Sequence, residues 1–412
     1  MASSFHCVLK GTDTKEGFLA AIEVPEHEKA ILKAAREEIR ACLREGFRQA
    51  GNATPLSKGF LVAGAPPHFA NADFLQSFRP LPRFASQGSF SYRTLNDPVR
   101  EHTPPQQVDI DDGVFLPTSF VKEEKPVFAA KAYFKVVEDS LRPLCREKGW
   151  TICEGARAKD SCVRILVSKK IHIDLPLYAI PDEDYEDAEK LEKALNAKGA
   201  LRESLEFASE AYDQLPEDHI LLAKRNGEWQ RSDPRKLSKW FEDAVRRHQG
   251  PHLRHVCRYL KAWRDFTWKE PSDGIPSVAL MAFAVRAFDE NRTRLDANRE
   301  DEALLAVAER MPDYLKAQMK NPVVQGEFLD KSWSPEKRSA LVREAEGLRD
   351  DLRAAKEATR ADAVLSRLTD CFGERVPKDA DLVQVFPSEE RAILSHPAQR
   401  VAAPIVGRHN SG

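Results

Sequence analysis

The sequence predicts an α+β protein of two lobes, in which a mixed β-sheet with flanking helices is followed by a helical lobe. Two stretches, 106–117 and 162–177, alternate apolar and polar residues as half-buried strands do. Helical periodicity surrounds them, and beyond Pro181 the strand signals nearly vanish. At 412 residues the chain also exceeds the size at which one hydrophobic core stops growing, which favours two domains.

A long amphipathic helix is predicted over residues 26–50, ahead of the sheet. Pro25 precedes it and Gly51-Asn52 follows it, which fits the usual start and stop signals of helices. Residues 52–82 are richer in Gly, Pro and Ala, so we expect loops there, and a second helix is expected over 125–149. The apolar residues of the first helix recur at helical spacing: Ile31, Ala35, Ile39, Leu43 and Phe47.

The second lobe is predicted to be built of helices. The acidic run 181–190 that leads into it is interpreted as a solvated connector rather than a metal site. We therefore expect a first lobe over 1–182, a helical lobe over 183–386 and a flexible tail over 387–412, with the active site in the cleft between the lobes. The expected helices are 187–198, 201–215, 235–247, 252–267, 277–291, 300–317 and 335–361.

Composition limits the possible functions. Hydrophobic residues make up 42% and charged residues 31%, as in ordinary soluble proteins, and the formal net charge of −2 argues against a general nucleic-acid coat. Neither a bilayer-spanning apolar run nor a secretory leader is evident in the sequence. The seven cysteines are scattered and never form CxxC, so we expect reduced thiols in a cytoplasmic protein.

Two carboxylates stand side by side in the stretch QQVDIDDGVFLP. On a strand, Val108, Ile110 and their even-numbered successors face one side, and Asp109 and Asp111 share the other. Two such charges repel each other unless a cation lies between them. Mg²⁺, a hard ion with oxygen ligands, suits this pair.

Two other stretches carry groups that could join the pair. RFASQGS ends in Gly88-Ser89, where the backbone can approach a phosphate and a hydroxyl is at hand. IHIDLPL supplies Asp174, a third carboxylate on a strand. Taken alone, a DxD pair is most often a solvated face or a calcium-binding loop. Together the three could hold two metal ions over a nucleoside triphosphate.

The order Gly-Ser, then DhD with h apolar, then a later hD resembles the nucleotidyltransferase superfamily of poly(A) polymerases and oligoadenylate synthases, which has a polymerase β-like fold. Within it the sequence resembles the cGAS/DncV-like nucleotidyltransferases, and among these the bacterial cyclic GMP-AMP synthase branch of anti-phage signalling enzymes. One departure is the long gap between Ser89 and Asp109, which contains three prolines and is interpreted as a loop insertion. The likeness rests on QGSFSYRTLN (87–96), PQQVDIDDGVFLP (105–117), HIDLPLYAIP (172–181) and CRYLKAWRDFTW (257–268).

The resemblance implies a chemistry for the carboxylates. Asp109, Asp111 and Asp174 would hold two Mg²⁺ ions, with Mn²⁺ as an alternative, and Asp174 would orient or deprotonate an attacking 3′-hydroxyl. ATP and GTP would be the substrates, and 3′,3′-cyclic GMP-AMP the product. Two alternatives stay open: another cyclic or linear nucleotide product, and a non-catalytic nucleotide-binding module.

The resemblance also implies contacts to the nucleotides. Gly88 and Ser89 would clasp the β- and γ-phosphates, with the help of two further residues. These are Lys261 and Ser277, which would also contact the triphosphate. Lys261 lies on a predicted helix together with Arg258 and Arg264. Without the resemblance, these three residues would be interpreted as surface charges. Ser277 is also expected to cap the next helix. The implied set is completed by Tyr92 stacking on a base, Gln87 reading a base edge and Arg164 contacting base or phosphate.

Two features bear on partners. His248, His252 and His255 could suggest zinc, but Gly250-Pro251 interrupts their helix and no cysteine pair accompanies them, so we expect no zinc site. Nothing in the sequence resembles the zinc-ribbon insertion of the animal DNA sensor of this family, and the net charge is near neutral, so we expect no activation by DNA. Similar bacterial synthases are often encoded with an E1/E2-like enzyme that conjugates the C-terminal residue of the synthase. This makes Gly412 a candidate for conjugation, although a tail without a role is the simpler interpretation.

Overall fold

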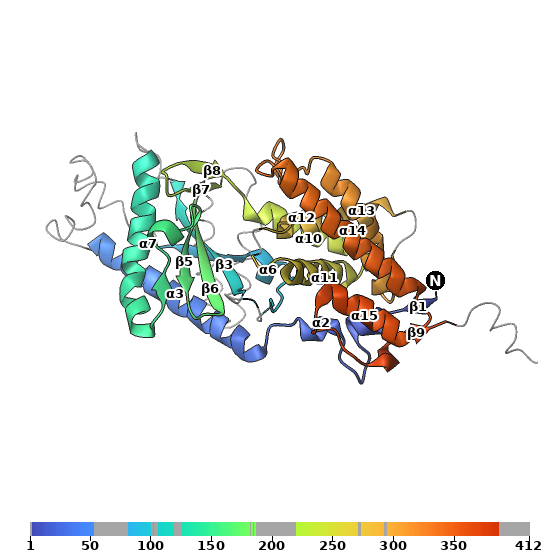
Figure 1. Cartoon of the computed structure of the whole chain (residues 1–412). Helices are drawn as coiled ribbons and strands as arrows, with labels where there is room; N and C mark the ends of the chain where they lie inside the picture. Colours follow the sequence, from blue (N-terminus) through green and yellow to red (C-terminus); the bar gives the residue numbers. More distant parts are fainter. Residues whose placement is uncertain are drawn as a thin grey trace, which may run out of the picture.

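The computed structural model describes residues 2–52, 81–99, 102, 106–118, 126–181, 183, 185–186, 220–270, 273–291 and 295–386. These residues form two lobes, one built on a β-sheet and one of helices, with helix α11 at their junction (Figure 1). The loops expected within 53–80, the helices expected over 187–198 and 201–215, and the tail with Gly412 lie outside the described residues.

The sheet of the first lobe is mixed. Its strands lie in the order β2-β3-β6-β5-β4, and β3 and β6 run parallel to each other, whereas β2 and β5 are antiparallel to them. Two short strands extend the sheet, because β7 pairs with the end of β6 and β8 pairs with β7. The strands are β2 (Arg83–Gln87), β3 (Val108–Pro117), β4 (Thr151–Ile152), β5 (Cys162–Leu166), β6 (Ile171–Ile180), β7 (Leu221–Ala223) and β8 (Trp229–Arg231).

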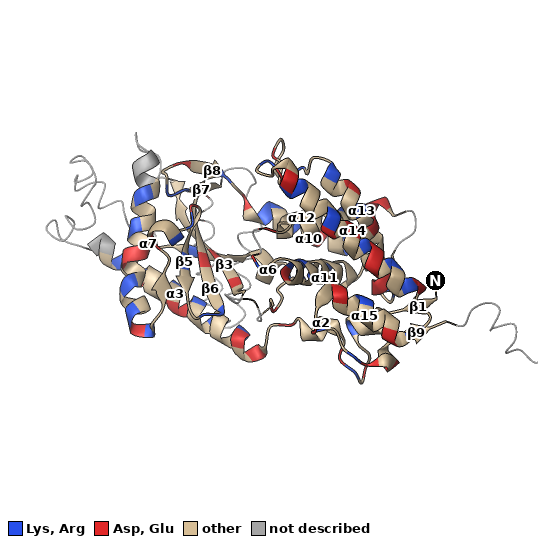
Figure 2. Ribbon diagram, viewed as in Figure 1, with Lys and Arg blue, Asp and Glu red and all other residues tan. Residues whose placement is uncertain are grey.

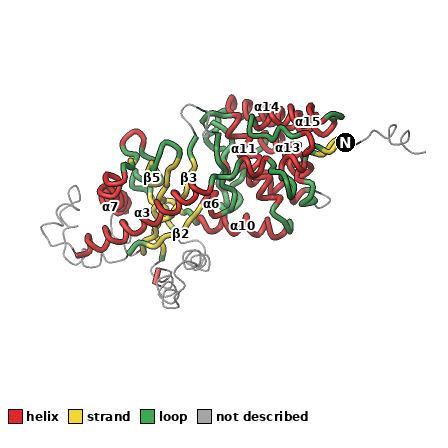
Figure 3. Tube along the Cα trace, turned by 90° about the horizontal axis from the view of Figure 1, so that it is seen from below, coloured by secondary structure: helices red, strands yellow, loops and turns green. Residues whose placement is uncertain are grey.

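Two long helices, α3 (Glu26–Asn52) and α7 (Pro126–Lys148), cover one face of this sheet. Seen from below, α3 runs across the sheet to the junction with the helical lobe (Figure 3). Ile39 and Leu43 of α3 pack in one core with the even-numbered Val114 and Leu116 of β3. The opposite face of β3, with its odd-numbered residues, is therefore left for the junction.

Asp112 breaks the apolar pattern on the helix-covered face. It is fully buried, and Arg40 of α3 donates Nε and Nη2 to its two carboxylate oxygens at 2.7 and 2.5 Å. A buried carboxylate requires such a partner because desolvation of an unpaired charge is costly. This pair therefore fixes α3 to the strand that carries Asp109 and Asp111.

The helical lobe is organised around α11 (His252–Thr267), which is buried along most of its length. Figures 1 and 3 show the other helices of the lobe gathered around it. Short N-terminal elements complete the lobe, and strand β1 pairs with β9 near residue 385. The elements are α10 (Pro234–Arg247), α12 (Ser277–Glu290), α13 (Glu300–Lys316), α14 (Pro335–Glu357), α15 (Ala361–Phe372), β1 (Ser3–Ser4), α1 (His6–Lys10), α2 (Phe18–Ala21) and β9 (Gln384–Val385).

The structure differs from the expected domain boundaries in two places. Residues 221–231 extend the sheet, although they were expected in the helical lobe 183–386. Phe5, Phe18 and Ile22 share a core with α11–α15, although they were expected in the first lobe 1–182. The sheet lobe is thus inserted into a helical lobe formed by both ends of the described chain.

The helix predictions within the described residues are confirmed with one exception. The expected helix over 335–361 ends at Glu357, and a separate helix, α15, follows from Ala361. The predicted helices over 26–50, 125–149, 235–247, 252–267, 277–291 and 300–317 each begin and end within two residues of the observed ones. No described helix is long and apolar enough to cross a bilayer.

Acidic and basic residues are interspersed along the helices of both lobes (Figure 2). On α7 this spacing forms ion pairs one turn apart, such as Lys135 with Asp139 at 2.7 Å. All seven cysteines are unpaired in the structure, and five of them are buried.

Candidate active site

The parallel pairing of β3 with β6 places four polar side chains on one face of the sheet. Asp109 is opposite His172, and Asp111 is opposite Asp174. Side chains of paired residues share a face, and so do those two positions apart along a strand. Asp109, Asp111, His172 and Asp174 therefore form a square on the face of the sheet that α3 and α7 leave uncovered.

The acidic members of this square repel one another. Burial, together with the nearby carboxylates of Asp109 and Asp174, raises the pKa of Asp111 to about 8. Arg164 of β5 donates Nε and Nη2 to Asp174 at 2.7 and 2.5 Å, which balances the charge of that carboxylate. Asp109 and Asp111 are left as the pair whose repulsion an incoming cation would relieve.

The Gly-Ser motif approaches Asp111 from the neighbouring strand. Strand β2 ends at Gln87, and one helical turn, α6 (Gly88–Ser91), follows at once. Gly88 has φ +67°, which a residue with a side chain seldom adopts, and a β-carbon there would collide with Asp111. Glycine therefore allows the turn to lie against the carboxylate pair.

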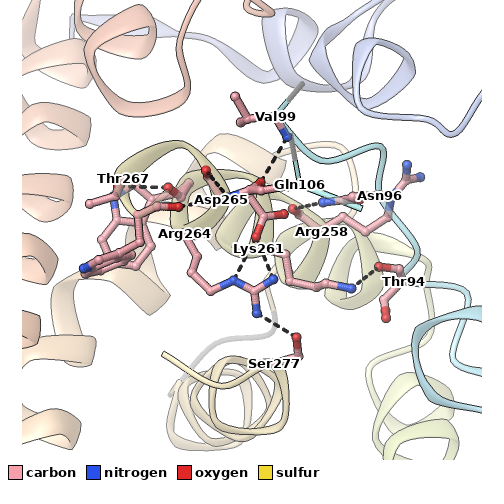
Figure 4. Close-up of polar contacts among 12 residues, drawn as sticks. Thr94, Asn96, Val99, Gln106, Arg258, Lys261, Arg264, Asp265, Thr267 and Ser277 are labelled. Atoms are coloured by element: carbon pink, nitrogen blue, oxygen red, sulfur yellow. Dashed lines mark hydrogen bonds and ion pairs between the residues drawn. The ribbon is translucent and has the colours of Figure 1, made fainter. Parts of the chain in front are cut away.

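Helix α11 forms the opposite wall, and the chain segment after the Gly-Ser turn binds to it. Lys261 Nζ donates to the carbonyl of Thr94 at 2.8 Å (Figure 4). Asn96 donates to the carbonyl of Arg258 at 2.8 Å and accepts from its guanidinium at 2.9 Å. Arg258, Lys261 and Arg264 are all buried, so the alternative interpretation of these residues as surface charges does not hold.

Lys261 is held in a setting that suits an anion. Burial and the positive charge of Arg264 lower the pKa of Lys261 to about 8. The ammonium group is thus charged near neutral pH but lacks a full complement of negative partners. A phosphate that enters beside it would supply that charge.

Gln106 joins the C-terminal end of α11 to the start of β3. Its Nε2 lies 2.9 to 3.1 Å from three carbonyl oxygens: that of Asp265 in the last turn of α11, that of the C-cap Trp268, and that of Lys269, the residue after it. Its Oε1 accepts from the amide of Val99 at 3.2 Å (Figure 4). Gln106 is buried, so these bonds set the spacing between Lys261 and Asp109.

Ser277 is the first residue of α12 and not its N-cap, which corrects the prediction. The N-cap is Pro276, and no side chain caps the helix. The hydroxyl of Ser277 instead accepts from Arg264 Nη1 at 2.8 Å (Figure 4). It stays at the helix N-terminus, where free amide groups favour an anion.

These groups surround one cavity of about 500 Å³ at the junction of the lobes. Two expected site residues are not on its wall. Tyr178 donates to Gln87 Oε1 at 3.0 Å, which keeps Gln87 over Gly113, and Asp174 pairs with Arg164. The residues predicted from sequence that do line the cavity are Gly88, Ser89, Tyr92, Asp109, Asp111, Arg164, Lys261 and Ser277.

Tyr92 reaches the cavity as part of the protein core. Its ring is mostly buried and meets Phe241 edge-on, with 6.3 Å between ring centroids. The three histidines considered for zinc have other partners. His248 contacts Asp289 and His255 contacts Glu300, both at 2.8 Å, while His252 packs against Phe288.

Sequence reasoning missed several residues of the site. His172, Gln107 and Arg264 line the cavity, and Gln106 and Asn96 fix its two walls. His172 had a signal, because it alternates with Asp174 on a predicted strand, and both glutamines belong to the PQQVDIDDGVFLP stretch. Arg264 had only its place one turn from Lys261.

The donor set fits a divalent cation. Asp109 and Asp111 supply hard oxygen ligands, and the raised pKa of Asp111 shows that negative charge is poorly compensated there. Within the described ranges, no three His, Cys, Asp or Glu side chains lie close enough together to hold a metal ion as they stand. Asp174 would complete such a set with the carboxylate lone pairs that Arg164 does not use.

A carboxylate-bearing strand that faces a Gly-Ser turn within a mixed sheet, closed by a helical lobe, assigns the chain to the nucleotidyltransferases. Comparison with known proteins narrows this class. The family described as "Cyclic GMP-AMP synthase DncV-like, nucleotidyltransferase domain" matches residues 82–178, and "Cyclic GMP-AMP synthase, C-terminal domain" matches 250–385. The chain belongs to the cGAS/DncV-like nucleotidyltransferases, in the bacterial cyclic GMP-AMP synthase branch. The recognition made from sequence is confirmed.

Individual relatives agree with this assignment. The cyclic GMP-AMP synthase of Vibrio cholerae is 31% identical over 407 residues, which cover 89% of each chain. A cyclic GMP-AMP synthase of Escherichia coli is 33% identical over 321 residues, covering 74% of this chain and 70% of that one.

Solved structures of the V. cholerae dinucleotide cyclase DncV share the fold. A mutant in complex with ATP, GTP and 5MTHFGLU2 superposes with a TM-score of 0.76 at 28% identity, covering 94% of this chain and all of that one. The complex with the linear intermediate 5′-pppA(3′,5′)pG gives a TM-score of 0.74 at the same identity and coverage. The predicted fold, a nucleotidyltransferase sheet lobe with a helical lobe, is confirmed.

Proposed function

We propose that this chain joins ATP and GTP into a cyclic dinucleotide, 3′,3′-cyclic GMP-AMP, in the cavity between its lobes. The observation that carries the proposal is the placement of Asp109 and Asp111 against the Gly-Ser turn and opposite Lys261, around one cavity. The relatives named above, which include a cyclase bound to a linear dinucleotide intermediate, support it.

The carboxylates would hold the metal and the attacking group. Asp109, Asp111 and Asp174 would be the ligands of Mg²⁺, two ions in all, with Mn²⁺ as a substitute. A divalent cation bound there supplies charge neutralisation at the reacting phosphate and lowers the pKa of a coordinated hydroxyl. Asp174 would orient the 3′-hydroxyl and accept its proton.

The opposite walls would hold the triphosphate. The amides and hydroxyl at Gly88 and Ser89 would donate to the β- and γ-phosphates from the turn. The Lys261 ammonium and the hydroxyl of Ser277 would donate from the helical lobe, and Tyr92 would contribute a ring beside the base. Because Gln87 is held by Tyr178 away from the cavity, we leave it out of the proposed contacts.

The reaction is a phosphoryl transfer carried out twice. The 3′-oxygen of one nucleotide forms a bond to the α-phosphorus of the other, the bond from that phosphorus to the bridging oxygen of the β-phosphate breaks, and pyrophosphate leaves. The resulting linear dinucleotide keeps one triphosphate and one free 3′-hydroxyl. A second transfer between these two groups closes the ring and releases a second pyrophosphate.

Mass spectrometry of the products formed from all four nucleoside triphosphates and Mg²⁺ tests the proposal. We expect cyclic GMP-AMP from the wild type, none from Asp109→Ala with Asp111→Ala, and an unchanged yield from Asp13→Ala, which alters an exposed carboxylate that does not line the cavity. A different cyclic or linear product would overturn the specificity and keep the reaction. A wild type that binds nucleotides without converting them would instead make the chain a non-catalytic binding module.

The biological setting proposed from the family branch is anti-phage signalling in the cytoplasm. Free, mostly buried cysteines fit a reducing compartment. Cells that carry the chain should resist phage infection, and cells with the double Asp109→Ala, Asp111→Ala variant should not. Conjugation of Gly412 by an E1/E2-like enzyme remains a separate proposal, tested by the loss of covalent adducts when residues 387–412 are removed.

A further inference from the structure

One buried nitrogen in the cavity has no hydrogen-bond partner among the described residues: Nε2 of His172. The side chain is 9% exposed and lines the cavity. It stands opposite Asp109 in the register of β3 with β6, and its Nε2 is 4.0 Å from Oδ2 of Asp174. A buried polar atom without a partner, in a residue that lines a ligand cavity, indicates that the ligand supplies the partner.

The neighbours of His172 define which hydrogen the ring carries. Gln107 Nε2 donates to the carbonyl of Lys169 at 3.2 Å, so the oxygen of this amide faces the histidine. That oxygen lies 2.9 Å from His172 Nδ1 and can only accept, so Nδ1 carries the proton. In the neutral ring Nε2 then carries a lone pair and no proton. The missing partner is therefore a hydrogen-bond donor.

The cavity already offers partners for phosphate on its other side. Gly88 and Ser89 follow β2, and β3 separates β2 from β6, so Asp109 and Asp111 of β3 lie between the Gly-Ser turn and His172. A reaction that joins two nucleotides needs the attacking one on the far side of these carboxylates. The donor groups of a nucleotide at that place, next to Asp174, are its ribose hydroxyls.

We propose that His172 Nε2 accepts a hydrogen bond from the 2′-hydroxyl of the attacking nucleotide while Asp174 holds its 3′-hydroxyl. The two hydroxyls of a ribose sit on neighbouring carbons, so one sugar can reach both acceptors. This contact selects ribonucleotides over 2′-deoxynucleotides as attackers, and Gln107 positions the ring by fixing its tautomer. The inference rests on the proposed function.

A competition experiment tests the contact. A 3′-deoxynucleotide can serve only as the attacked partner, because it lacks the attacking hydroxyl. The protein is given 3′-deoxy-ATP with equal amounts of GTP and 2′-deoxy-GTP, and then 3′-deoxy-GTP with ATP and 2′-deoxy-ATP. The two linear products in each mixture are quantified by mass spectrometry. Their ratio is internal to one reaction, so partial loss of folded protein does not change it.

The wild type should favour the ribonucleotide about tenfold, the effect of one hydrogen bond in a buried site. His172→Asn retains a donor for Gln107 but has no atom at the Nε2 position, and its ratio should fall to within about twofold of one. His172→Gln can place an acceptor oxygen near that position and should restore the preference. His27→Asn, at an exposed histidine, should match the wild type.

The remaining outcomes separate the inference from the proposed function. A ribonucleotide preference that His172→Asn leaves intact overturns the inference alone. If that variant also binds Mn²⁺ more weakly in a titration without nucleotide, Nε2 is a metal ligand instead. If the wild type forms no linear product from any mixture, the proposed function fails and the inference fails with it.

Discussion

A β-carbon placed on Gly88 would lie 2.0 Å from Oδ2 of Asp111, so the Gly-Ser turn touches the carboxylate that the metal must reach. Gly88→Ala would therefore push the turn and the carboxylate apart. It would also strain a backbone with φ +67°, at a cost of about 1–2 kcal/mol. We expect at least about a hundredfold loss of dinucleotide formation, because small displacements at a reacting centre are costly.

Steady-state rates and a urea unfolding curve check this prediction. Gly149→Ala is the matched control, because Gly149 also has a positive φ but a β-carbon there meets nothing within 4 Å. Gly88→Ala should lose at least as much stability as Gly149→Ala, because it adds a collision to the same backbone strain, and only Gly88→Ala should lose activity. Equal activity of the two variants would show that the close approach of Gly88 to Asp111 is not needed for dinucleotide formation.

The pKa of Asp111 predicts how stability depends on pH in metal-free protein. The folded state keeps a proton on this carboxyl up to about pH 8, whereas an unfolded chain releases it near the ordinary value of 3.8. The folded state therefore binds more protons between these values, and the free energy of unfolding falls as pH rises through them. Asp111→Asn carries no such proton, so its stability should change less and should exceed that of the wild type at pH 8.

Thermal unfolding in EDTA from pH 5 to 9 measures this effect. Added Mg²⁺ should stabilise the wild type more at pH 8 than at pH 6, because the cation competes with the proton. It should not stabilise Asp111→Asn to the same extent. Parallel stability curves for the two proteins would contradict the prediction.

Lys261 should matter to nucleotide binding more than to stability. Lys261→Met removes a charge-assisted hydrogen bond to phosphate, and we expect affinity for the triphosphate to fall about 10- to 100-fold. The loss of its bond to the Thr94 carbonyl is offset because a buried charge with a lowered pKa is also removed. The stability should then change by less than about 1 kcal/mol. Calorimetric titration with ATP or GTP, beside urea unfolding, would show whether binding alone is lost.

Gln106 should affect catalysis through the spacing of the lobes. Gln106→Met keeps the length of the side chain but removes its hydrogen bonds to the carbonyls of Asp265 and Trp268 and from the amide of Val99, at a cost of about 1–3 kcal/mol. The turnover number should fall because Lys261 is no longer fixed relative to Asp109. Gln49→Met, at an exposed glutamine, serves as the control. A stable variant with full turnover would remove the role of this residue.

The buried pair of Arg40 and Asp112 should show the asymmetry typical of such pairs. Arg40→Met leaves a fully buried carboxylate without its partner and should cost about 3–5 kcal/mol. Adding Asp112→Leu removes that charge and should recover most of the loss. Urea unfolding of both variants measures the difference. An additive loss in the double variant would show that the pair is not the source of the effect.

Local pattern was sufficient to predict the elements that carry the chemistry. Alternation of apolar and polar residues predicted β3 and β6 and the face of the sheet on which Asp109 and Asp111 lie. Helical spacing of apolar residues predicted α3 and α11. Strands β7 and β8 have three residues each, too few for a period to be visible. Asp112 interrupts the apolar face at a position that no local rule explains, because its partner Arg40 lies 72 residues away.

The details of the site depend on contacts between distant segments. Burial of Arg258, Lys261 and Arg264 follows from Thr94, Asn96 and Ser277, which no spacing along α11 could indicate. The resemblance implied that Gln87 contacts the edge of a base. In the structure its Oε1 instead accepts a hydrogen bond from the hydroxyl of Tyr178, 91 residues later in the chain. The unpaired nitrogen of His172 likewise becomes visible only when β3 and β6 are side by side.

The pairing of β1 with β9 sets the order in which the molecule can form as it is synthesised. Ser3 and Ser4 leave the ribosome before the sheet lobe has been made, but their strand partners near residue 385 emerge only after it. The sheet-bearing segment can fold while the helical partners of Phe5 and Phe18 are still absent. The helical core can therefore be completed only after the sheet lobe has been made, so a nascent chain that ends with the sheet would bear the carboxylates without α11, the opposite wall of the cavity.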